Sequence, residues 1–559
     1  MNEIKVGIIV GESTTTEFTF ACDPKGFPTQ WEYLLINSQE LIKGQLQPIQ
    51  ILAQNMHNVS ESPTLTEDLD LQALERLKKH DLGDVKVYGT ARILGFFSLL
   101  DKDKKQVLMP RRPLTPGMDV LLAPSAFLKD FFQVPKEEAL YLGELISRPD
   151  VSVSVSVNGL RRHLAILAQT GGGKSYTTGV LMEELYELGA TIIVIDPHAD
   201  YVLLNRDEKG QSRNKNIVIY RNPNSTSRFT TAEMGNVQPF TVKFGKLDPS
   251  DVAELAGIKK SDNNQLALIE ESVKYLRNNA GVENNNPYDD IPDTIDVNFT
   301  PQDMLDVLQQ IHDTPNAPEW ADIPPEAKKT ASRVMSKVRR FTRRRVFGNT
   351  RVPLNNFLQD QKISVIDLSG LEQEDQDYIA YRLLTDLYDH CSGQPDPKPV
   401  FIFIEEAHNF VPEPGKKRTR SSRSINKISS EGRKFGMFLV LITQRPKKID
   451  PDSLSQCNSQ IILRITNPKD QTAIQDSAER VSQDLLDDLP GLNVGDAILV
   501  GQITKIPILA HIRPRKTKEG GRDIDVVTKL KKARQNASDQ ANTISPTDRD
   551  ERERERNPF

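Results

Sequence analysis

Residues 167–180 read "LAQTGGGKSYTTGV", in which three glycines, a lysine and a serine lie between two apolar segments. A glycine loop at the N-terminus of a helix can hold phosphate groups, because its backbone N–H groups and the helix dipole attract negative charge. Lys174 is expected to reach the β- and γ-phosphates of a nucleotide, and the Ser175 hydroxyl to bind Mg²⁺. The residues expected to contact the nucleotide are Gln169, Thr170, Gly171, Gly172, Gly173, Lys174, Ser175 and Tyr176.

The segments around this loop favour the same interpretation. "HLAILA" (163–168) predicts a buried strand, "YTTGVLMEELYEL" (176–188) a helix and "TIIVID" (191–196) a second strand. A phosphate-binding loop requires this order of elements. The loop departs from the pattern GxxxxGK[ST] at one position, where Ala168 replaces the first glycine. Since that position donates neither a lysine nor a hydroxyl, we expect alanine to be tolerated, and an incidental glycine turn is the less favoured alternative.

Two consecutive carboxylates end another predicted strand, "PVFIFIEEAHNF" (399–410). In P-loop NTPases an acid at this place holds the Mg²⁺ shell, and a following glutamate polarises the attacking water. Glu405 is therefore assigned to the metal and Glu406 to the water, although the metal-side residue is more often aspartate. Taken alone, the pair would be ordinary strand-end carboxylates; the phosphate loop favours the catalytic reading.

Further polar residues follow or precede the next strand, "MFLVLITQRP" (437–446). Gln444 at its end is expected to contact the γ-phosphate and respond to its loss. Arg433, before the strand, would by itself be a surface arginine, but an arginine supplied by a neighbouring subunit can stabilise transition-state charge. "NPKD" (467–470) resembles the guanine-reading NKxD motif with its lysine displaced, so ATP is favoured over GTP.

The elements that must position these residues form an α/β fold. Residues 1–145 contain short strand-like segments typical of a small β-barrel, whereas 146–245 and 350–515 alternate strands and helices as in a parallel sheet. Residues 246–349 show helical spacing and predict a helical insertion. Residues 516–559 carry few apolar side chains, so this segment is expected to be a disordered charged tail.

Composition limits the class of protein. The 559 residues are 37% hydrophobic and 27% charged, which predicts a globular protein with a sizeable core. The N-terminus does not resemble a signal peptide, and no apolar segment approaches the roughly 18 residues of a membrane span. The three cysteines are far apart and form no metal-binding or disulfide pattern. We therefore expect a cytoplasmic protein without membrane association.

The net charge of −5 means that affinity for nucleic acid would have to come from local basic clusters. The segment "KKRTRSSR" (416–423) follows a predicted loop after the Glu405–Glu406 strand, and it supplies the DNA-binding candidates Lys416, Lys417, Arg418 and Arg420. The segment "KVRRFTRRR" (337–345) is the competing candidate, with Arg343 to Arg345 at its end. A solvated charged surface remains the alternative for both.

Motifs from the whole chain up to about residue 515 resemble the HerA family of hexameric DNA-translocating ATPases, relatives of FtsK. The segments that carry the resemblance are "VGIIVGESTTTEFTF", "RRHLAILAQTGGGKS", "VIDPHADY", "FIEEAHNFVP", "EGRKFGMFLVLITQRP" and "LPGLNVGDAILVG". The resemblance implies an N-terminal HAS barrel, a RecA-like P-loop ATPase core with a helical insertion, ATP and Mg²⁺ as cofactors, and a homohexameric ring.

The resemblance also assigns roles to residues. It implies that Arg433 is a trans-acting arginine finger and that Arg162, just before the loop strand, is a second phosphate-sensing arginine. Asp196 matches the family's acid beside the nucleotide, although a structural cap of the neighbouring loop is an equal alternative. Ala199 and Asp200 stand where the family often has Gly-Glu.

The expected function is an ATP-driven motor that moves double-stranded DNA through a ring and works with a NurA-like nuclease in DNA end resection. The alternative is a ring-shaped ATPase scaffold that regulates an anti-phage defence effector, such as a sirtuin-like NADase or another nuclease. A secretion or conjugation ATPase is less favoured, because no membrane segment is expected. The N-terminal barrel is expected to support assembly and partner docking, or stability alone.

Overall fold

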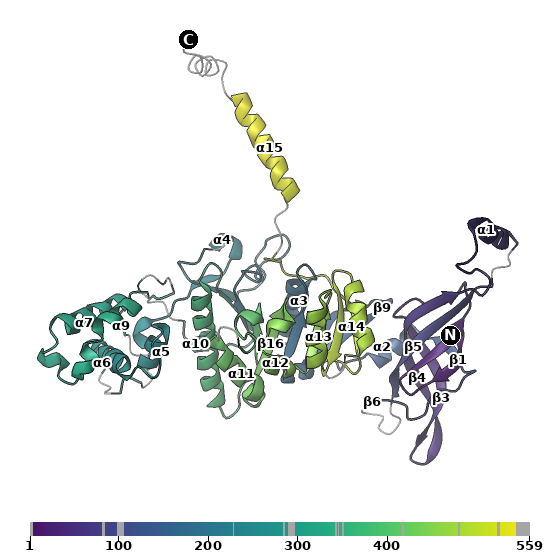
Figure 1. Cartoon of the computed structure of the whole chain (residues 1–559), viewed down its shortest axis with the longest axis horizontal. Helices are drawn as coiled ribbons and strands as arrows, with labels where there is room; N and C mark the ends of the chain where they lie inside the picture. Colours follow the sequence, from purple (N-terminus) through teal and green to yellow (C-terminus); the bar gives the residue numbers. More distant parts are fainter. Residues whose placement is uncertain are drawn as a thin grey trace, which may run out of the picture.

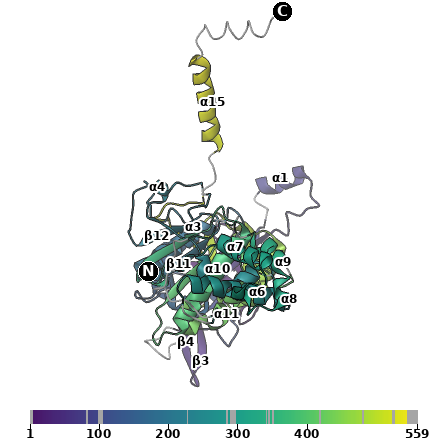
Figure 2. The ribbon, with the colours of Figure 1, turned by 90° about the vertical axis from the view of Figure 1, so that its left-hand side faces the viewer.

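The computed structural model describes residues 4–80, 84–97, 106–226, 228–282, 286–288, 297–340, 342, 344, 346–348, 352–415, 419–478, 481–521 and 526–543. A β-barrel, a central α/β unit and a block of helices follow one another along the longest axis (Figure 1). Helix α15 (Val526–Thr543) projects from the central unit, and the short helix α1 (Leu71–Lys79) projects on the same side (Figure 2).

The N-terminal barrel closes through six strands. The hydrogen-bonded order is β2-β1-β7-β3-β4-β5-β6, and an additional pairing of β2 with β5 joins the two ends of the six-stranded part. Side chains that point inward from these strands, such as those of Phe18, Phe20, Ile36 and Ile51, form a separate core inside the barrel. Its strands are β1 (Lys5–Ser13), β2 (Glu17–Cys22), β3 (Tyr33–Ile42), β4 (Gln45–Glu61), β5 (Lys86–Phe97), β6 (Val107–Leu108) and β7 (Asp119–Leu122).

The central unit is built on a twelve-stranded sheet in the order β13-β12-β14-β11-β15-β16-β10-β17-β18-β19-β8-β9. The strands from β13 to β17 run parallel, and β18, β19, β8 and β9 continue the sheet in antiparallel fashion. The strands are β8 (Ala139–Leu145), β9 (Arg148–Ser156), β10 (Leu164–Leu167), β11 (Thr191–Asp196), β12 (Ile217–Arg221), β13 (Val237–Pro239), β14 (Lys362–Asp367), β15 (Val400–Ile404), β16 (Met437–Thr443), β17 (Ser459–Leu463), β18 (Asp496–Gly501) and β19 (Ile508–Ile512). The α/β fold predicted from the sequence, with its barrel and helical insertion, is confirmed.

Helices cover both faces of this sheet, which explains the continuous apolar sequence of its strands. In β11, Ile192 and Val194 join the core that contains α3, whereas Ile193 and Ile195 join the core that contains α10 and α11. The helices of this unit are α3 (Lys174–Glu187), α4 (Thr231–Met234), α10 (Gln373–Ser392), α11 (Ser421–Glu431), α12 (Pro451–Ser455), α13 (Pro468–Ser477) and α14 (Gln483–Asp488). The core around α3 continues into the barrel and α2 (Ser125–Phe131) through residues such as Tyr33 and Phe131.

Strands β8 and β9 lie on the two sides of the domain boundary at residue 145 that the sequence predicted. The predicted barrel ended at residue 145, yet β8 and β9 are paired with each other and belong to the central sheet. β8 also pairs with β19, through Ala510 and Leu145. The barrel sheet itself ends with β7 at Leu122. A truncation near residue 146 would therefore remove a strand from the ATPase core.

The helical insertion has its own hydrophobic core, centred on residues such as Leu268, Met304 and Val334. Helix α7 starts at a capping box formed by Thr300 and Asp303, with Pro301 in the first turn, a combination that favours helix initiation. The helices are α5 (Pro249–Leu255), α6 (Asn263–Asn279), α7 (Pro301–Asp313), α8 (Pro325–Lys328) and α9 (Ala331–Val338).

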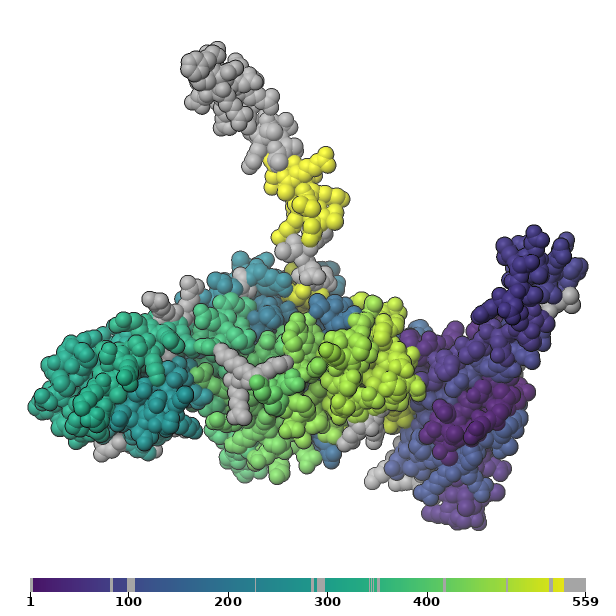
Figure 3. Space-filling model, in the orientation of Figure 1, coloured from purple at the N-terminus to yellow at the C-terminus, as the bar shows by residue number. Residues whose placement is uncertain are grey.

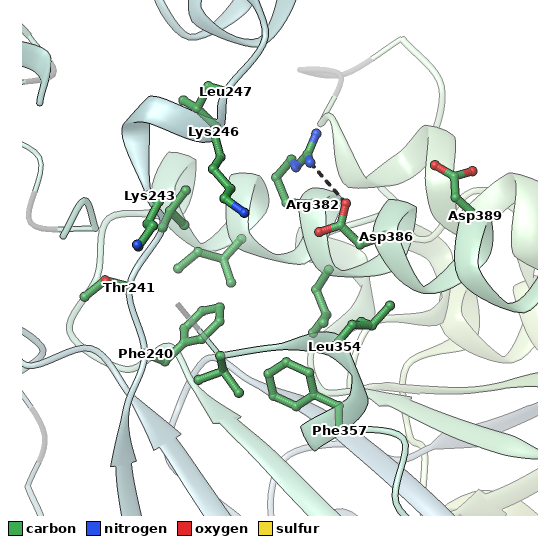
Figure 4. Close-up of a pocket in the computed structure, with 14 residues that line it drawn as sticks. Phe240, Thr241, Lys243, Lys246, Leu247, Leu354, Phe357, Arg382, Asp386 and Asp389 are labelled. Atoms are coloured by element: carbon green, nitrogen blue, oxygen red, sulfur yellow. Dashed lines mark hydrogen bonds and ion pairs between the residues drawn. The ribbon is translucent and has the colours of Figure 1, made fainter. Parts of the chain in front are cut away.

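A cavity of about 330 Å³ lies where the insertion leaves and rejoins the central unit (Figure 4). Phe240 and Phe357 line its apolar side. Arg382 of α10 lines the opposite side, where it pairs with Asp386 and also reaches Asp251 of α5, at 3.1 Å in both cases. Arg382 thus connects the insertion to a helix that packs directly on the central sheet.

The C-terminal segment after β19 crosses helix α3. The Arg515 side chain lies against Gly179, where a Cβ atom would come within 2.5 Å of the guanidinium, so a larger residue would displace Arg515. Glu183 accepts hydrogen bonds from the backbone of Lys516 and Thr517. The packed chain therefore continues beyond residue 515, where the sequence placed the start of a tail.

Helix α15 lies within the segment that was expected to be disordered. Its described side chains are exposed, and it stands away from the body of the protein in the space-filling view (Figure 3). Good helix formers such as Lys, Arg, Gln and Ala account for its helical conformation without tertiary packing. Among the residues that the structure describes, no helix is long and apolar enough to cross a membrane.

Candidate nucleotide-binding site

The glycine loop between β10 and α3 has the backbone of a phosphate cradle. Gly171 and Gly173 adopt positive φ angles of 76° and 94°, and Gly173 is the N-cap of α3. A Cβ on Gly172 would lie 3.1 Å from the Gln169 carbonyl oxygen, so the turn closes tightly there. Ala168, which replaces the first glycine of the motif, is fully buried in the core on the α3 side. Its methyl group packs in this core, which accounts for alanine in place of the first glycine of the motif.

The loop lysine lies against the two carboxylates that end β15. The Lys174 Nζ atom donates to Glu405 Oε1 and lies 3.3 Å from Glu406 Oε1. In the sheet, β15 is separated from the loop strand β10 only by β16, so these side chains converge at one edge. Glu406 has a left-handed backbone (φ 48°, ψ 48°), which is uncommon for a residue with a side chain and is found at functional sites.

Glu406 is held in its ionised form. Its burial favours the protonated acid, but His408 and Lys174 outweigh this effect and lower its pKa to about 2. The His408 Nδ1 atom lies 3.2 Å from Glu406 Oε2 and 2.9 Å from the Thr443 hydroxyl of β16. Glu406 Oε2 is buried and, apart from the His408 ring, has no hydrogen-bond partner within the described residues, so it can also accept a hydrogen bond from a water molecule.

A second carboxylate stands beside the loop serine. The Ser175 hydroxyl donates to Asp200 Oδ2 at 3.0 Å, and the Tyr201 hydroxyl donates to Glu405 Oε2 at 2.6 Å. The oxygens of Ser175, Glu405 and Asp200 match the preference of Mg²⁺ for hard oxygen ligands. No role for Asp200 was predicted from the sequence, although its position beside Ala199 in the "DPHADY" motif was the available signal.

Asp196 supports the loop that carries Asp200. Its carboxylate accepts hydrogen bonds from the backbone N–H groups of His198, Asp200 and Tyr201 at 2.9–3.2 Å. Burial, followed by the nearby carboxylates of Asp200 and Asp367, raises its pKa to about 8. These contacts correspond to the structural-cap alternative for Asp196.

Other loop residues form contacts that fix the shape of the cradle. Thr170 donates its hydroxyl to Gln444 Oε1, which brings the end of β16 onto the loop. Gln169 accepts from the backbone and hydroxyl of Thr466 after β17. The Tyr176 hydroxyl accepts from the Arg515 backbone N–H at 2.8 Å, so it binds the C-terminal segment. Gln444 thus lies at the cradle, as the sequence suggested.

Arg162 and Arg433 lie at the amino ends of the parallel strands, opposite to the carboxyl ends that carry the phosphate loop. Arg162 precedes β10 in a 3-10 helix (Val157–Arg162), and Arg433 precedes β16 in another (Gly432–Phe435). Both side chains are exposed. The loop follows the carboxyl end of β10, and four strand residues span about 13 Å. The two arginines therefore lie at the end of the strands opposite to the phosphate loop of their own chain.

The predicted DNA-binding residues are described only in part. Lys416, Lys417 and Arg418 lie outside the described residues, as do Arg343 and Arg345 of the competing cluster. Arg420 is described, and its guanidinium reaches across to the insertion. It donates to the Glu254 carbonyl oxygen at 2.9 Å and pairs with the Glu254 carboxylate at 3.4 Å.

The two basic segments meet at one cleft of about 690 Å³ between the insertion and the central unit. Arg340 and Arg344 line it from the insertion side, and Arg420 and Arg423 from the other side. Acidic residues balance them: Arg344, for example, pairs with Glu374 at 2.9 Å. The two segments are therefore neighbours in space.

Taken together, a parallel sheet, a glycine loop with Lys174 and Ser175, and carboxylates on the adjacent strands define a P-loop ATPase with a RecA-like core. Residues 140–387 match the family model described as "Helicase HerA, central domain". The DNA double-strand break repair helicase HerA of Pyrococcus furiosus is 28% identical over 590 residues, covering 95% of this chain and 97% of that protein. A probable helicase of Methanocaldococcus jannaschii is 28% identical over 540 residues, covering 94% of each. The chain is therefore similar to HerA helicases over nearly its whole length.

Solved structures show a more distant likeness. VirB4 of Thermoanaerobacter pseudethanolicus aligns with a TM-score of 0.47 and 17% identity, covering 68% of this chain and 97% of that one. The plasmid coupling protein TrwB in complex with ADP and Mg²⁺ aligns with a TM-score of 0.41 and 13% identity, covering 71% and 94%.

Proposed function

We propose that this protein is an ATP-driven motor that translocates double-stranded DNA in the repair of DNA breaks and acts as a homohexameric ring. The observation that carries the proposal is the position of Arg162 and Arg433, which are exposed on the sheet edge opposite to the phosphate loop. A site that needs such an arginine is complete only when a second copy supplies it. Relatives named as double-strand break repair helicases align over nearly the whole chain, which supports the DNA substrate.

Within one subunit the residues divide the work of hydrolysis. Lys174 and the loop N–H groups bind the phosphates, and Ser175, Glu405 and Asp200 would hold Mg²⁺, which supplies charge neutralisation at the phosphates when bound. Glu406 accepts a hydrogen bond from the attacking water and orients it. Gln444, fixed to the loop by Thr170, senses the γ-phosphate.

The positions of the arginines support head-to-tail association of subunits. Arg162 and Arg433 are exposed at the end of the strands opposite to the phosphate loop. A second copy can therefore bring them to the loop only through contact between unlike surfaces, and such contacts close into rings when the rotation permits. In the ring, Arg433 would act as the finger and Arg162 as a second phosphate contact.

The path from the nucleotide site to DNA runs through the segment after β15. Asp377 of α10 accepts hydrogen bonds from the backbone N–H groups of Arg420 and Ser421 at 2.9 and 3.0 Å. Arg420 then contacts Glu254 of the insertion. We propose that Lys416, Lys417 and Arg418 bind DNA, with Arg420 linking the segment to the insertion. A NurA-like nuclease is the proposed partner, and a defence effector is the alternative.

Mixed rings test the proposal. Arg433→Ala subunits keep the phosphate loop, and Lys174→Ala subunits keep the finger, so mixing the two inactive proteins should restore part of the DNA-stimulated ATP hydrolysis. The measurement is phosphate release after mixing, with ring assembly of each variant checked by native mass spectrometry. Lack of recovery in mixed rings would contradict action in trans, and absence of rings would contradict the proposed assembly.

A further inference from the structure

The strand order determines where the base of a bound nucleotide must lie. Glu405, Glu406 and Gln444 follow β15 and β16, on one side of the loop strand β10. Strands β17 and β18 lie on its other side. Since the terminal phosphate faces the carboxylates, the sugar and base extend from the loop towards the end of β17 and the start of β18, which pair through Leu463 and Ala497.

The residues on that side approach the loop closely. Gly495, with φ 91°, packs on Gly173: its backbone nitrogen would be 3.5 Å from a Cβ on Gly173. A Cβ on Gly495 would in turn lie 3.3 Å from the His511 Cε1 atom of β19. The neighbouring Val494 is 64% exposed. An exposed valine and an aromatic ring therefore flank the glycine that packs on the loop.

The His511 ring has a defined orientation. Its side chain is 57% exposed, and its Nδ1 atom lies 2.8 Å from Oδ1 of the buried Asp496. Asp496 is itself fixed, because its Oδ2 atom accepts from the backbone and side-chain amides of Asn493. A carboxylate can only accept, so Nδ1 carries a proton; in the neutral imidazole Nε2 is then an acceptor.

We propose that Val494 and His511 form the base subsite and that it selects adenine. The inference rests on the proposed function, in that the loop holds a nucleotide. Val494 and the His511 ring provide the apolar contact for the base, and His511 Nε2 accepts a hydrogen bond from the exocyclic amino group of adenine. Guanine presents a carbonyl acceptor at the equivalent position, and two acceptors facing each other are unfavourable.

The test compares three ligands that are not hydrolysed: ADP, purine riboside diphosphate, which lacks the amino group, and inorganic pyrophosphate. Binding to the full-length chain is measured by calorimetry with Mg²⁺. The wild-type protein should bind ADP about tenfold more tightly than purine riboside diphosphate, the effect of one hydrogen bond. In His511→Phe, which keeps a flat ring without the acceptor, this ratio should fall to about one.

Two further variants separate recognition from packing. His511→Gln can donate to Asp496 and still present an acceptor, so it should keep the preference for ADP. Val494→Ser should weaken the binding of both nucleoside diphosphates by a similar factor. Val59→Ser, at an exposed valine of the barrel, should change the binding of neither. Pyrophosphate binding should be the same in all of these variants.

The outcomes distinguish the base subsite from the phosphate site. An unchanged ratio in His511→Phe, with pyrophosphate binding intact, would overturn the assignment of His511 and leave the nucleotide site standing. If pyrophosphate binds equally well to the wild-type protein and to Lys174→Ala, the nucleotide site itself is wrongly assigned, and the base subsite with it.

Discussion

At the residue scale, Glu406 and Lys174 perform different tasks and should fail differently when replaced. Lys174→Ala removes the charge that binds the phosphates and should abolish nucleotide binding. Glu406→Gln keeps the shape of the side chain but weakens its interaction with the attacking water, so ATP should remain bound while hydrolysis falls by about 10²- to 10³-fold. Equilibrium binding and steady-state phosphate release measure the two effects separately.

The control variant for both measurements is Glu413→Gln. It changes an acidic residue beyond the end of β15 and should retain the parental rate of hydrolysis. Hydrolysis at the parental rate by Glu406→Gln would show that another group orients the water.

Asp200 provides a second prediction at this scale. Its carboxylate accepts the Ser175 hydroxyl at 3.0 Å, so it orients an oxygen that would bind Mg²⁺. Asp200→Asn should raise the Mg²⁺ concentration needed for half-maximal ATP hydrolysis by about tenfold, the typical effect of losing a group that orients a ligand. The reference is Glu208→Gln, at an exposed position of the following loop. Equal Mg²⁺ dependence in both variants would remove Asp200 from the metal site.

At the element scale, His163 joins three parts of the central unit. It precedes β10; its Nε2 atom lies 3.0 Å from the Ser429 carbonyl oxygen of α11, and its Nδ1 atom accepts from the Leu439 N–H of β16 at 2.9 Å. This pattern requires the neutral ring with its proton on Nε2. Burial, together with the charge of Arg433, lowers the pKa of His163 to about 4, although the bond to Ser429 opposes the change.

A lowered pKa makes the stability of the fold depend on pH. The unfolded chain binds a proton on this histidine below pH 6.5, whereas the folded chain binds it only near pH 4. The stabilisation is therefore complete above pH 6.5 and is lost as the pH falls from 6.5 to 4, by about 3 kcal/mol. His163→Gln can keep both hydrogen bonds without titrating, so the free energy of unfolding from urea titrations should depend less on pH in this window. A slope identical to that of the wild-type protein would contradict this assignment.

The sequence predicted elements better than it predicted contacts between them. β11 is recognisable because every residue of "TIIVID" suits a strand buried on both faces, and the glycine loop because its residues are contiguous. Asp200 was assigned no role because its partner Ser175 comes close only when β15 and β16 have assembled between β11 and β10. The membership of β8 in the central sheet also depends on a remote strand, β19, which no local pattern specifies.

At the scale of the whole molecule, the barrel presents a projecting hairpin between β3 and β4 (Figure 1). Leu41 and Leu46 are directly paired across it and are 51% and 54% exposed. Two adjacent exposed leucines on a projecting hairpin form a small apolar surface. We predict that the proposed nuclease docks at this hairpin.

Replacing both leucines with serine should remove binding of a co-expressed NurA-like nuclease and leave basal ATP hydrolysis unchanged, because the barrel core and the phosphate loop are not altered. The measurement is co-purification of the nuclease with the tagged chain, accompanied by the ATPase rate. Val59→Ser, at a similarly exposed position near the other end of β4, is the matched control and should retain the nuclease. Retention of the nuclease by the double variant would exclude the hairpin as the docking surface.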